Sequence, residues 1–147
     1  MLPVSYRGYI SSRSFGGERA PQHVQNLVIR TYCKRNEFEY LLSATELAMP
    51  GCFLMLEQLL NDIESLEGIV CYSLQQLPDD VSKREEIFER IILTGRSIHF
   101  AVEGLYVRDF SSARRVGEIA EVQSVMAFCL SAKELRDVVA KGNYYRG

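Results

Sequence analysis

The chain has 147 residues, of which 47% are hydrophobic and 24% are charged, and its formal net charge is −2. This composition is typical of one soluble, globular domain with its own core. The acidic balance disfavours a nucleic-acid partner, since domains that bind phosphate backbones are usually basic. No apolar run approaches the roughly 20 residues that span a bilayer, and residues 1–7 lack the pattern of a signal peptide. We therefore expect a cytoplasmic protein without a membrane partner.

The first half of the chain predicts two strands, each followed by a helix. Residues 8–12 form a short apolar strand, and a loop rich in glycine and serine follows it. Pro21 suits the first turn of a helix, and apolar residues then recur at helical spacing. Residues 38–43 predict the second strand, residues 44–51 a loop, and residues 53–63 the second helix.

The second half begins with an apolar run from Gly68 that has no polar alternation, which favours a strand buried on both faces. Ser82 and Glu85 have the spacing of a capping box, which predicts the start of a third helix. Gly95 is well placed to end that helix. Residues 97–102 predict a fourth strand.

Strands and helices alternate with short connections, which favours a parallel sheet with right-handed crossovers. We predict an α/β fold with a four-stranded, mainly parallel sheet of flavodoxin-like order 2-1-3-4 and helices on both faces. A long C-terminal helix starts near Ser112, and its broad apolar stripe favours a homodimer or a higher oligomer. Residues 1–147 form a single domain, with frayed ends at 1–5 and 141–147.

The loop after the first strand is the best candidate binding site. It lies between a strand end and a helix amino end, where free N–H groups attract anions. Two arginines add charge suited to a phosphate or carboxylate. The alternative is a solvated loop whose hydroxyls cap the turn. The candidate ligand-binding residues here are Ser11, Ser12, Arg13 and Arg19.

Polar residues also follow the other strands, and parallel strands present their carboxyl ends at one edge of a sheet. Ser43 and Glu46 follow the second strand, Ser73 follows the third, and Glu103 follows the fourth. Glu46 and Glu103 are candidate acid or base residues. The alternative is that they pair with the arginines of the first loop.

Amide side chains near these positions suit the recognition of sugar hydroxyls, although solvated surface amides are an equal alternative. They are Gln22, Gln25, Asn26, Gln75 and Gln76. His23 is a candidate proton carrier, whereas His99 reads as a core or rim residue. Neither histidine has a second ligand at metal-binding spacing, so we expect no metal and no cofactor. Four scattered cysteines read as reduced core residues: Cys33, Cys52, Cys71 and Cys129.

Between Tyr6 and Arg108 the chain resembles, remotely, the catalytic domain of serine recombinases, which have a resolvase fold. The matching stretches are Tyr9 to Arg13, Gln25 ahead of Tyr32-Cys33, Cys71 to Asp79, and Gly95 to Glu103. This resemblance implies the family's fold.

The departures from the recombinase pattern affect its chemistry. Arg13 stands at the position of the family's nucleophilic serine, and Ser11 stands at its first arginine. Gln76 and Asp79 replace two further arginines. Recombinases need those arginines to stabilise the transferring phosphoryl group, so the resemblance implies the fold without the recombinase reaction.

A closer resemblance covers nearly the whole chain and is to the sporadic carbohydrate cluster proteins, which are encoded among genes for surface polysaccharide or nucleotide-sugar synthesis. It is carried by four stretches: Tyr6 to Arg13, Glu18 to Asn26, Tyr40 to Glu46, and His99 to Glu103. The resemblance implies a role near sugar chemistry and supplies no reaction.

We therefore expect a protein that binds or modifies a phosphorylated or nucleotide-activated sugar. In this hypothesis Arg13 and Arg19 hold the anion, and amides read the hydroxyls. If the protein is a catalyst, Glu46 or Glu103 moves a proton without a metal, as in an isomerase, epimerase or lyase. The alternative is a non-catalytic accessory subunit that joins a carbohydrate enzyme through the final helix.

Overall fold

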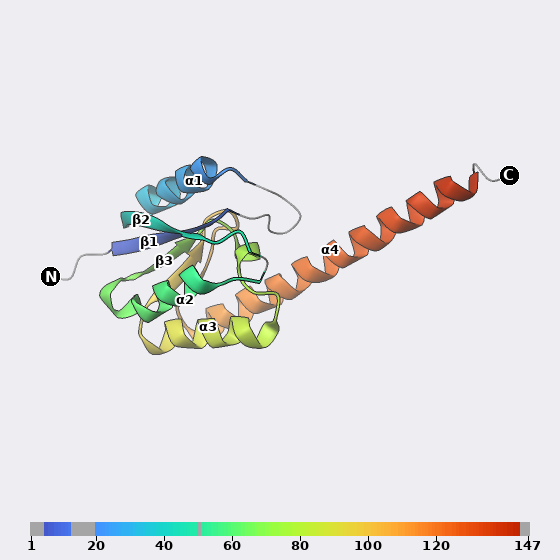
Figure 1. The fold of residues 1–147 in the computed structure, drawn as a ribbon. Helices are drawn as coiled ribbons and strands as arrows, with labels where there is room; N and C mark the ends of the chain where they lie inside the picture. The colour runs from blue at the N-terminus through green and yellow to red at the C-terminus, as the bar shows by residue number, and fades with distance from the viewer. Residues whose placement is uncertain (1–4, 13–19, 50, 145–147) are drawn as a thin grey trace.

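The computed structural model has an α/β fold in which one sheet is covered by helices on both faces, and a long final helix extends away from this body (Figure 1). It describes residues 5–12, 20–49 and 51–144. Within the final helix, it describes the side chains of residues 110–126 and of Cys129.

The sheet has five strands in the order β2-β1-β3-β4-β5. The first four are parallel and confirm the predicted order 2-1-3-4. The fifth strand is antiparallel to β4 and was not predicted, because its three residues directly follow the turn expected to close the fourth strand. The strands are β1 (Ser5–Ser11), β2 (Glu39–Glu46), β3 (Gly68–Cys71), β4 (Ser97–Phe100) and β5 (Leu105–Val107).

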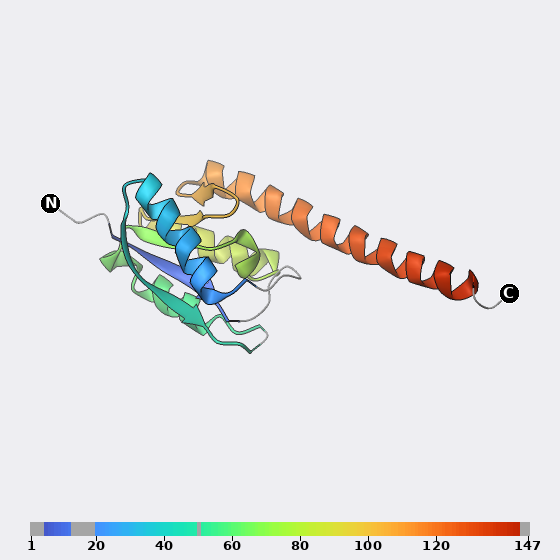
Figure 2. The same cartoon turned by 90° about the horizontal axis from the view of Figure 1, so that it is seen from above.

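Helix α1 covers one face of the sheet, and α2, α3 and the first turns of α4 cover the other (Figures 1 and 2). Each face has its own core, the larger one on the side of α2 and α3. Two short 3₁₀ helices, η1 and η2, flank β3. The helical elements are α1 (Gln22–Arg35), α2 (Leu54–Asn61), η1 (Ile63–Ser65), η2 (Leu74–Gln76), α3 (Val81–Leu93) and α4 (Phe110–Tyr144).

Strand β3 lies at the centre of the sheet, and all four of its residues are buried. Val70 packs into the core beneath α1, whereas Ile69 and Cys71 pack into the core beneath α2 and α3. This confirms the strand predicted from the apolar run. Burial raises the pKa of the Cys71 thiol well above its usual range, so this cysteine is an unreactive core residue.

The helix ends differ from the prediction at one point. The start of α3 is capped by Asp80, whose side chain accepts a 3.2 Å hydrogen bond from the Lys83 N–H. The capping box expected at Ser82 is therefore wrong. At the other end Gly95 has a φ of +70° and its N–H donates to Ile92, which confirms its predicted place.

Strand β2 is an edge strand and continues to Glu46, beyond its predicted end at Ser43. Its register against β1 shifts between Arg7 and Tyr9, where Gly8 of β1 lies opposite two residues of β2, Leu42 and Ser43. This extra residue is a β-bulge. The Arg7 Nε donates a 3.0 Å hydrogen bond to the carbonyl of Leu42 at this point, while the Leu42 side chain stays 76% exposed.

Helix α4 has 35 residues and extends well beyond the body in both views (Figures 1 and 2). It begins at Phe110, two residues before the predicted start, and the Asp109 side chain accepts a hydrogen bond from Ser112 at its first turn. Cys129 is exposed on this helix, so the prediction of a core residue is wrong there. Among the described residues, no helix is long and apolar enough to cross a membrane.

His99 lies in the core beneath α1, as the sequence predicted, and is 7% exposed. Its Nδ1 shares a 2.8 Å hydrogen bond with the Tyr32 hydroxyl, and its Nε2 shares one of 2.9 Å with the Ser97 hydroxyl. Rings of Tyr6 and Phe38 pack edge-on against the imidazole. Burial, and secondarily the positive charge of Arg108, lowers the His99 pKa from 6.5 to about 4.

The buried His99 predicts an acid-sensitive fold. Between pH 6.5 and about 4 the unfolded chain binds a proton at His99 that the native chain does not, so the free energy of unfolding falls as pH drops through this range. We expect His99 to account for a loss of roughly 2–3 kcal/mol. Urea titrations at pH 7 and near pH 4.5 measure it.

In that experiment His99→Gln should remove this part of the pH dependence while keeping polar atoms for Tyr32 and Ser97. The same substitution at exposed His23 is the matched control. An unchanged pH dependence in His99→Gln would contradict the assignment.

Candidate functional site

The carboxyl ends of β1 and β2 and the turn after β3 meet at one edge of the sheet. Ser11, the last residue of β1, lies opposite Glu46, the last residue of β2. From the other side the Gln76 side chain donates a 3.0 Å hydrogen bond to the Ser11 hydroxyl. The strand order reverses between β1 and β3, and this is where open α/β sheets place their ligands.

Gln25 joins this strand end to helix α1 and has no exposed surface. Its Oε1 accepts a 2.9 Å hydrogen bond from the Ser11 N–H, and its Nε2 donates to the carbonyls of Ser11 and Ala20, each at 2.8 Å. The amide therefore satisfies the backbone at the point where the chain leaves the sheet. Its hydrogen bonds are made within the protein.

Glu46 is completely buried, yet its carboxylate is surrounded by donors. The Tyr9 hydroxyl donates to it at 2.9 Å, and the N–H groups of Met55 and Leu56, in the first turn of α2, donate at 3.1–3.2 Å. A further donor is the N–H of Leu47. The residue preceding α2 is Phe53, whose side chain cannot cap it, so Glu46 acts as the cap and neutralises the positive helix end.

The hydrogen bonds to Glu46 outweigh its burial. Burial alone raises the pKa of this carboxyl, but the backbone N–H groups of Met55 and Leu56 and the Tyr9 hydroxyl together hold the pKa below its ordinary value of 4.5. The side chain is therefore a carboxylate at neutral pH. Because its oxygens accept these hydrogen bonds, the carboxylate stabilises the start of α2.

Glu103 has a parallel role on the other side of the edge. It accepts a 2.7 Å hydrogen bond from the Ser73 hydroxyl and bonds of 3.1–3.2 Å from the Leu74 N–H. Ser73 in turn forms a capping box with Gln76 at the start of η2. Both candidate acid–base carboxylates thus hold the amino ends of helical turns.

The other predicted residues are placed as follows. Ser12 donates a 2.8 Å hydrogen bond to the Glu46 carbonyl at the same edge. Ser43 lies inside β2 because that strand is longer than predicted, and its hydroxyl bonds Asn26 and Tyr40 beneath α1. The structure therefore separates Ser43 from the strand ends.

Gln22 and His23 are exposed in the first turn of α1, and Gln75 is exposed on η2. Arg13 and Arg19, the predicted anion ligands, lie outside the described residues. The first-loop hypothesis therefore rests, for its charge, on the sequence.

Two cavities are found among the described residues, and neither is lined by Ser11, Gln25 or Glu46. The larger, of about 550 Å³, lies between α3 and α4. The smaller, of about 110 Å³, lies between η2 and α4 and includes Gln75. Within the same part of the chain, no cluster of three or more His, Cys, Asp or Glu side chains is arranged to hold a metal ion.

Comparisons with known proteins support the fold. The structure is similar to a resolvase family site-specific recombinase from Streptococcus pneumoniae, with a TM-score of 0.57, 11% identity, and coverage of 93% of this chain and 98% of that one. It is also similar to the N-terminal catalytic domain of TP901-1 integrase, with a TM-score of 0.56, 15% identity, and coverage of 84% and 98%. No family profile and no curated protein matches the sequence.

At these low identities the likeness concerns the fold, and it confirms the remote resolvase-like resemblance.

Two residues of the strand edge were not recognised as central from the sequence. Gln76 was one amide among five, and Tyr9 was one aromatic residue of a strand. Their roles depend on which neighbours the sheet order brings to them, and neither has a local sequence signal.

The site predicts that Glu46 contributes mainly to stability. Glu46→Gln replaces one acceptor oxygen with a donor that faces N–H groups, so we expect a loss of roughly 3 kcal/mol in the free energy of unfolding. Urea denaturation at pH 7 measures the loss. Glu57→Gln on the same helix is the matched control, since its 2.6 Å ion pair with Arg90 is at the surface and should contribute less than about 1 kcal/mol. Equal effects of the two substitutions would contradict the capping role.

Proposed function

We propose that this chain is a non-catalytic assembly protein, an accessory subunit that acts through α4. The observation that carries this proposal is the state of the two candidate carboxylates. Glu46 is fully buried with its oxygens occupied, and Glu103 caps η2. A general base needs a lone pair within reach of its substrate. Glu46 offers none in this arrangement, and both oxygens of Glu103 already accept hydrogen bonds from Ser73 or Leu74.

The final helix supports assembly. Val122, Val125 and Met126 are each more than half exposed and recur at i, i+3, i+4, which places them on one side of the helix. That side is opposite to Val116 and Ala120, which pack on the body. Water-exposed apolar stripes of this kind pair with other helices, and a second copy supplies an identical stripe.

The solved structures of similar fold are a site-specific recombinase and the catalytic domain of an integrase, but DNA strand exchange is not the function we propose. The sequence has Arg13 where the resemblance expects the nucleophilic serine, and Gln76 and Asp79 where it expects arginines. The net charge of −2 also disfavours binding to a phosphate backbone.

The assembly proposal predicts a dimer. Light scattering of the native chain should give twice its mass of 16.8 kDa, and Val122→Glu should give the monomer mass because it places a charge in the helix–helix contact. Ser124→Glu adds the same charge away from the stripe and should leave the dimer intact. A native chain that stays monomeric across the concentration range would refute assembly through α4.

A second candidate function is the binding of a phosphorylated or nucleotide-activated sugar at the strand edge. It is supported by the resemblance to carbohydrate cluster proteins and by the meeting of Ser11, Ser12 and Gln76 where the strand order reverses. In this reading Arg13 and Arg19 hold the anion. The sugar is bound rather than converted, since Glu46 is occupied.

The sugar hypothesis predicts a thermal shift. A nucleotide sugar or a sugar phosphate that binds the native state should raise the melting temperature, by mass action, and Arg13→Ala should abolish the shift. Arg115→Ala, on exposed α4, is the matched control and should keep it. No shift with any compound of a broad panel, for a chain that melts cooperatively, would exclude this second function.

A further inference from the structure

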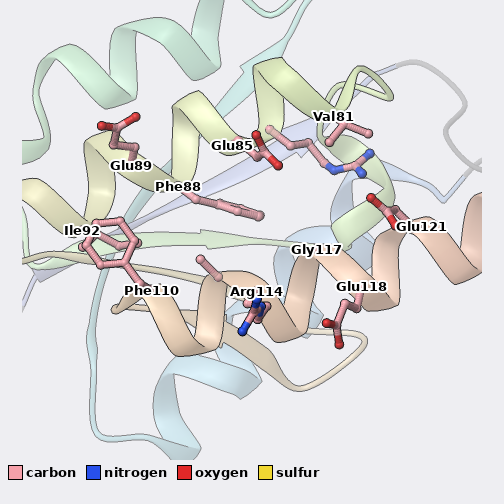
Figure 3. Close-up of a pocket in the computed structure, with 12 residues that line it drawn as sticks. Val81, Glu85, Phe88, Glu89, Ile92, Phe110, Arg114, Gly117, Glu118 and Glu121 are labelled. Carbon is pink, nitrogen blue, oxygen red and sulfur yellow. The ribbon is translucent and has the colours of Figure 1, made fainter.

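The groove between α3 and α4 is a cavity of about 550 Å³. Its floor is apolar and includes Phe88, Ile92 and Phe110. In Figure 3 the Phe88 ring points from α3 toward α4. Phe110 is 66% exposed at one end of the groove, which is unusual for a large aromatic side chain without a partner.

The rim of this groove is acidic. Glutamates come from both helices and line the cavity: Glu85, Glu89, Glu118 and Glu121 (Figure 3). None of these glutamates forms an ion pair with a described residue. The ion pair found in the described part of the chain joins Arg90 to Glu57, outside the groove. Two arginines, Arg84 and Arg114, also line the groove. Negatively charged side chains therefore outnumber positively charged ones in its lining.

One of these arginines is buried and hydrogen-bonded to the backbone. Arg84 is 6% exposed, and its Nη1 donates a 3.1 Å hydrogen bond to the Asp79 carbonyl. Arg114 is exposed. The glutamates on either side of an apolar floor therefore dominate the charge that a visiting molecule meets.

The helix that forms one side of the groove is long enough to align with another helix. Helix α3 has 13 residues and is therefore about 20 Å long, enough to align with three to four turns of another helix. On α4 the groove side carries Ala113 and Gly117, and a Cβ added at Gly117 would meet nothing within 4 Å. Small residues at such positions let a second helix approach closely.

We propose that the groove between α3 and α4 binds an amphipathic helix of a partner protein whose apolar ridge is flanked by lysine or arginine. The apolar ridge covers Phe88, Ile92 and Phe110, and the flanking cations meet the glutamates on both sides. This inference rests on the proposed accessory function, for which it names the chemistry of the partner.

Most of the groove lies on a different side of α4 from the dimer stripe, although Glu118 is one turn before Val122 and borders both surfaces. At 3.6 residues per turn, Val122, Val125 and Met126 lie roughly 100° around the α4 axis from the side that carries Gly117 and Glu121. A second copy on the stripe and a partner helix in the groove can therefore be bound together.

The test uses the full chain and two labelled synthetic peptides of roughly 14 residues, about the length of α3. Both have leucines at i, i+3, i+4, i+7, flanked by lysines in one peptide and by glutamates in the other. Fluorescence anisotropy should show the lysine peptide binding at least about tenfold more tightly, with an affinity that falls as salt is added.

Charge-reversed variants assign the binding to the groove. Glu85→Lys combined with Glu89→Lys, both on α3 and therefore away from the stripe of α4, should weaken the lysine peptide at least about tenfold and favour the glutamate peptide. Glu64→Lys combined with Glu86→Lys makes the same change in net charge at exposed sites outside the groove and should leave the preference unchanged. Circular dichroism verifies that each variant is folded.

Three outcomes would overturn the proposal: no difference between the two peptides, an equal effect of the control pair, or a change in oligomer mass caused by Glu85→Lys with Glu89→Lys. The last would assign the groove to a second copy of this chain. Repeating the titration with Val122→Glu distinguishes a failure of dimerisation through α4 from a failure of the groove to bind a partner helix. A monomeric variant that still prefers the lysine peptide would show that the groove binds without the dimer.

Discussion

Placing a carboxylate in a protein core is costly unless donors replace the water that it loses. At Glu46 the donors come from β1, from the residue that follows β2 and from the first turn of α2. One buried charge thereby fixes the position of a helix relative to two strands. The alternative, a neutral carboxyl, would leave the amino end of α2 without its cap.

The same solution is used twice along one edge of the sheet. Glu103 holds the start of η2 as Glu46 holds the start of α2, and Gln25 and Gln76 complete the network between β1 and β3. In an enzyme active site, carboxylates and amides of this kind would contact the substrate. Here they bond backbone N–H and carbonyl groups and one another's neighbouring hydroxyls, so their hydrogen-bonding capacity is used within the fold.

Much of the fold follows from local patterns in the sequence. The apolar run from Gly68 specified the central strand, and the alternation of strands and helices specified the parallel order. Strand β5 was not predicted because three residues carry too little periodicity. The cap of α3 was misassigned because Asp80 and Ser82 both suit the position, and only the path of the preceding turn decides between them.

The site was less predictable than the fold, for a physical reason. Sequence patterns indicated which polar residues follow the strands, and most of those residues do meet. They do not indicate whether a carboxylate such as Glu46 will face a cavity or the amino end of a helix, since that depends on packing between segments that are distant in the sequence. Ser43 illustrates the sensitivity: three more residues of strand moved it from the edge to the middle of β2.

The two edges of the sheet have a consequence for how the protein behaves at high concentration. A bare edge strand invites the same strand of another molecule, and sheets that grow in this way end as insoluble aggregates. Here one edge, β2, is interrupted by the bulge at Leu42, whose carbonyl is already bonded to Arg7. The other edge, β5, has three residues. Neither edge offers a long, regular template, so open-ended pairing of sheets from different molecules is disfavoured.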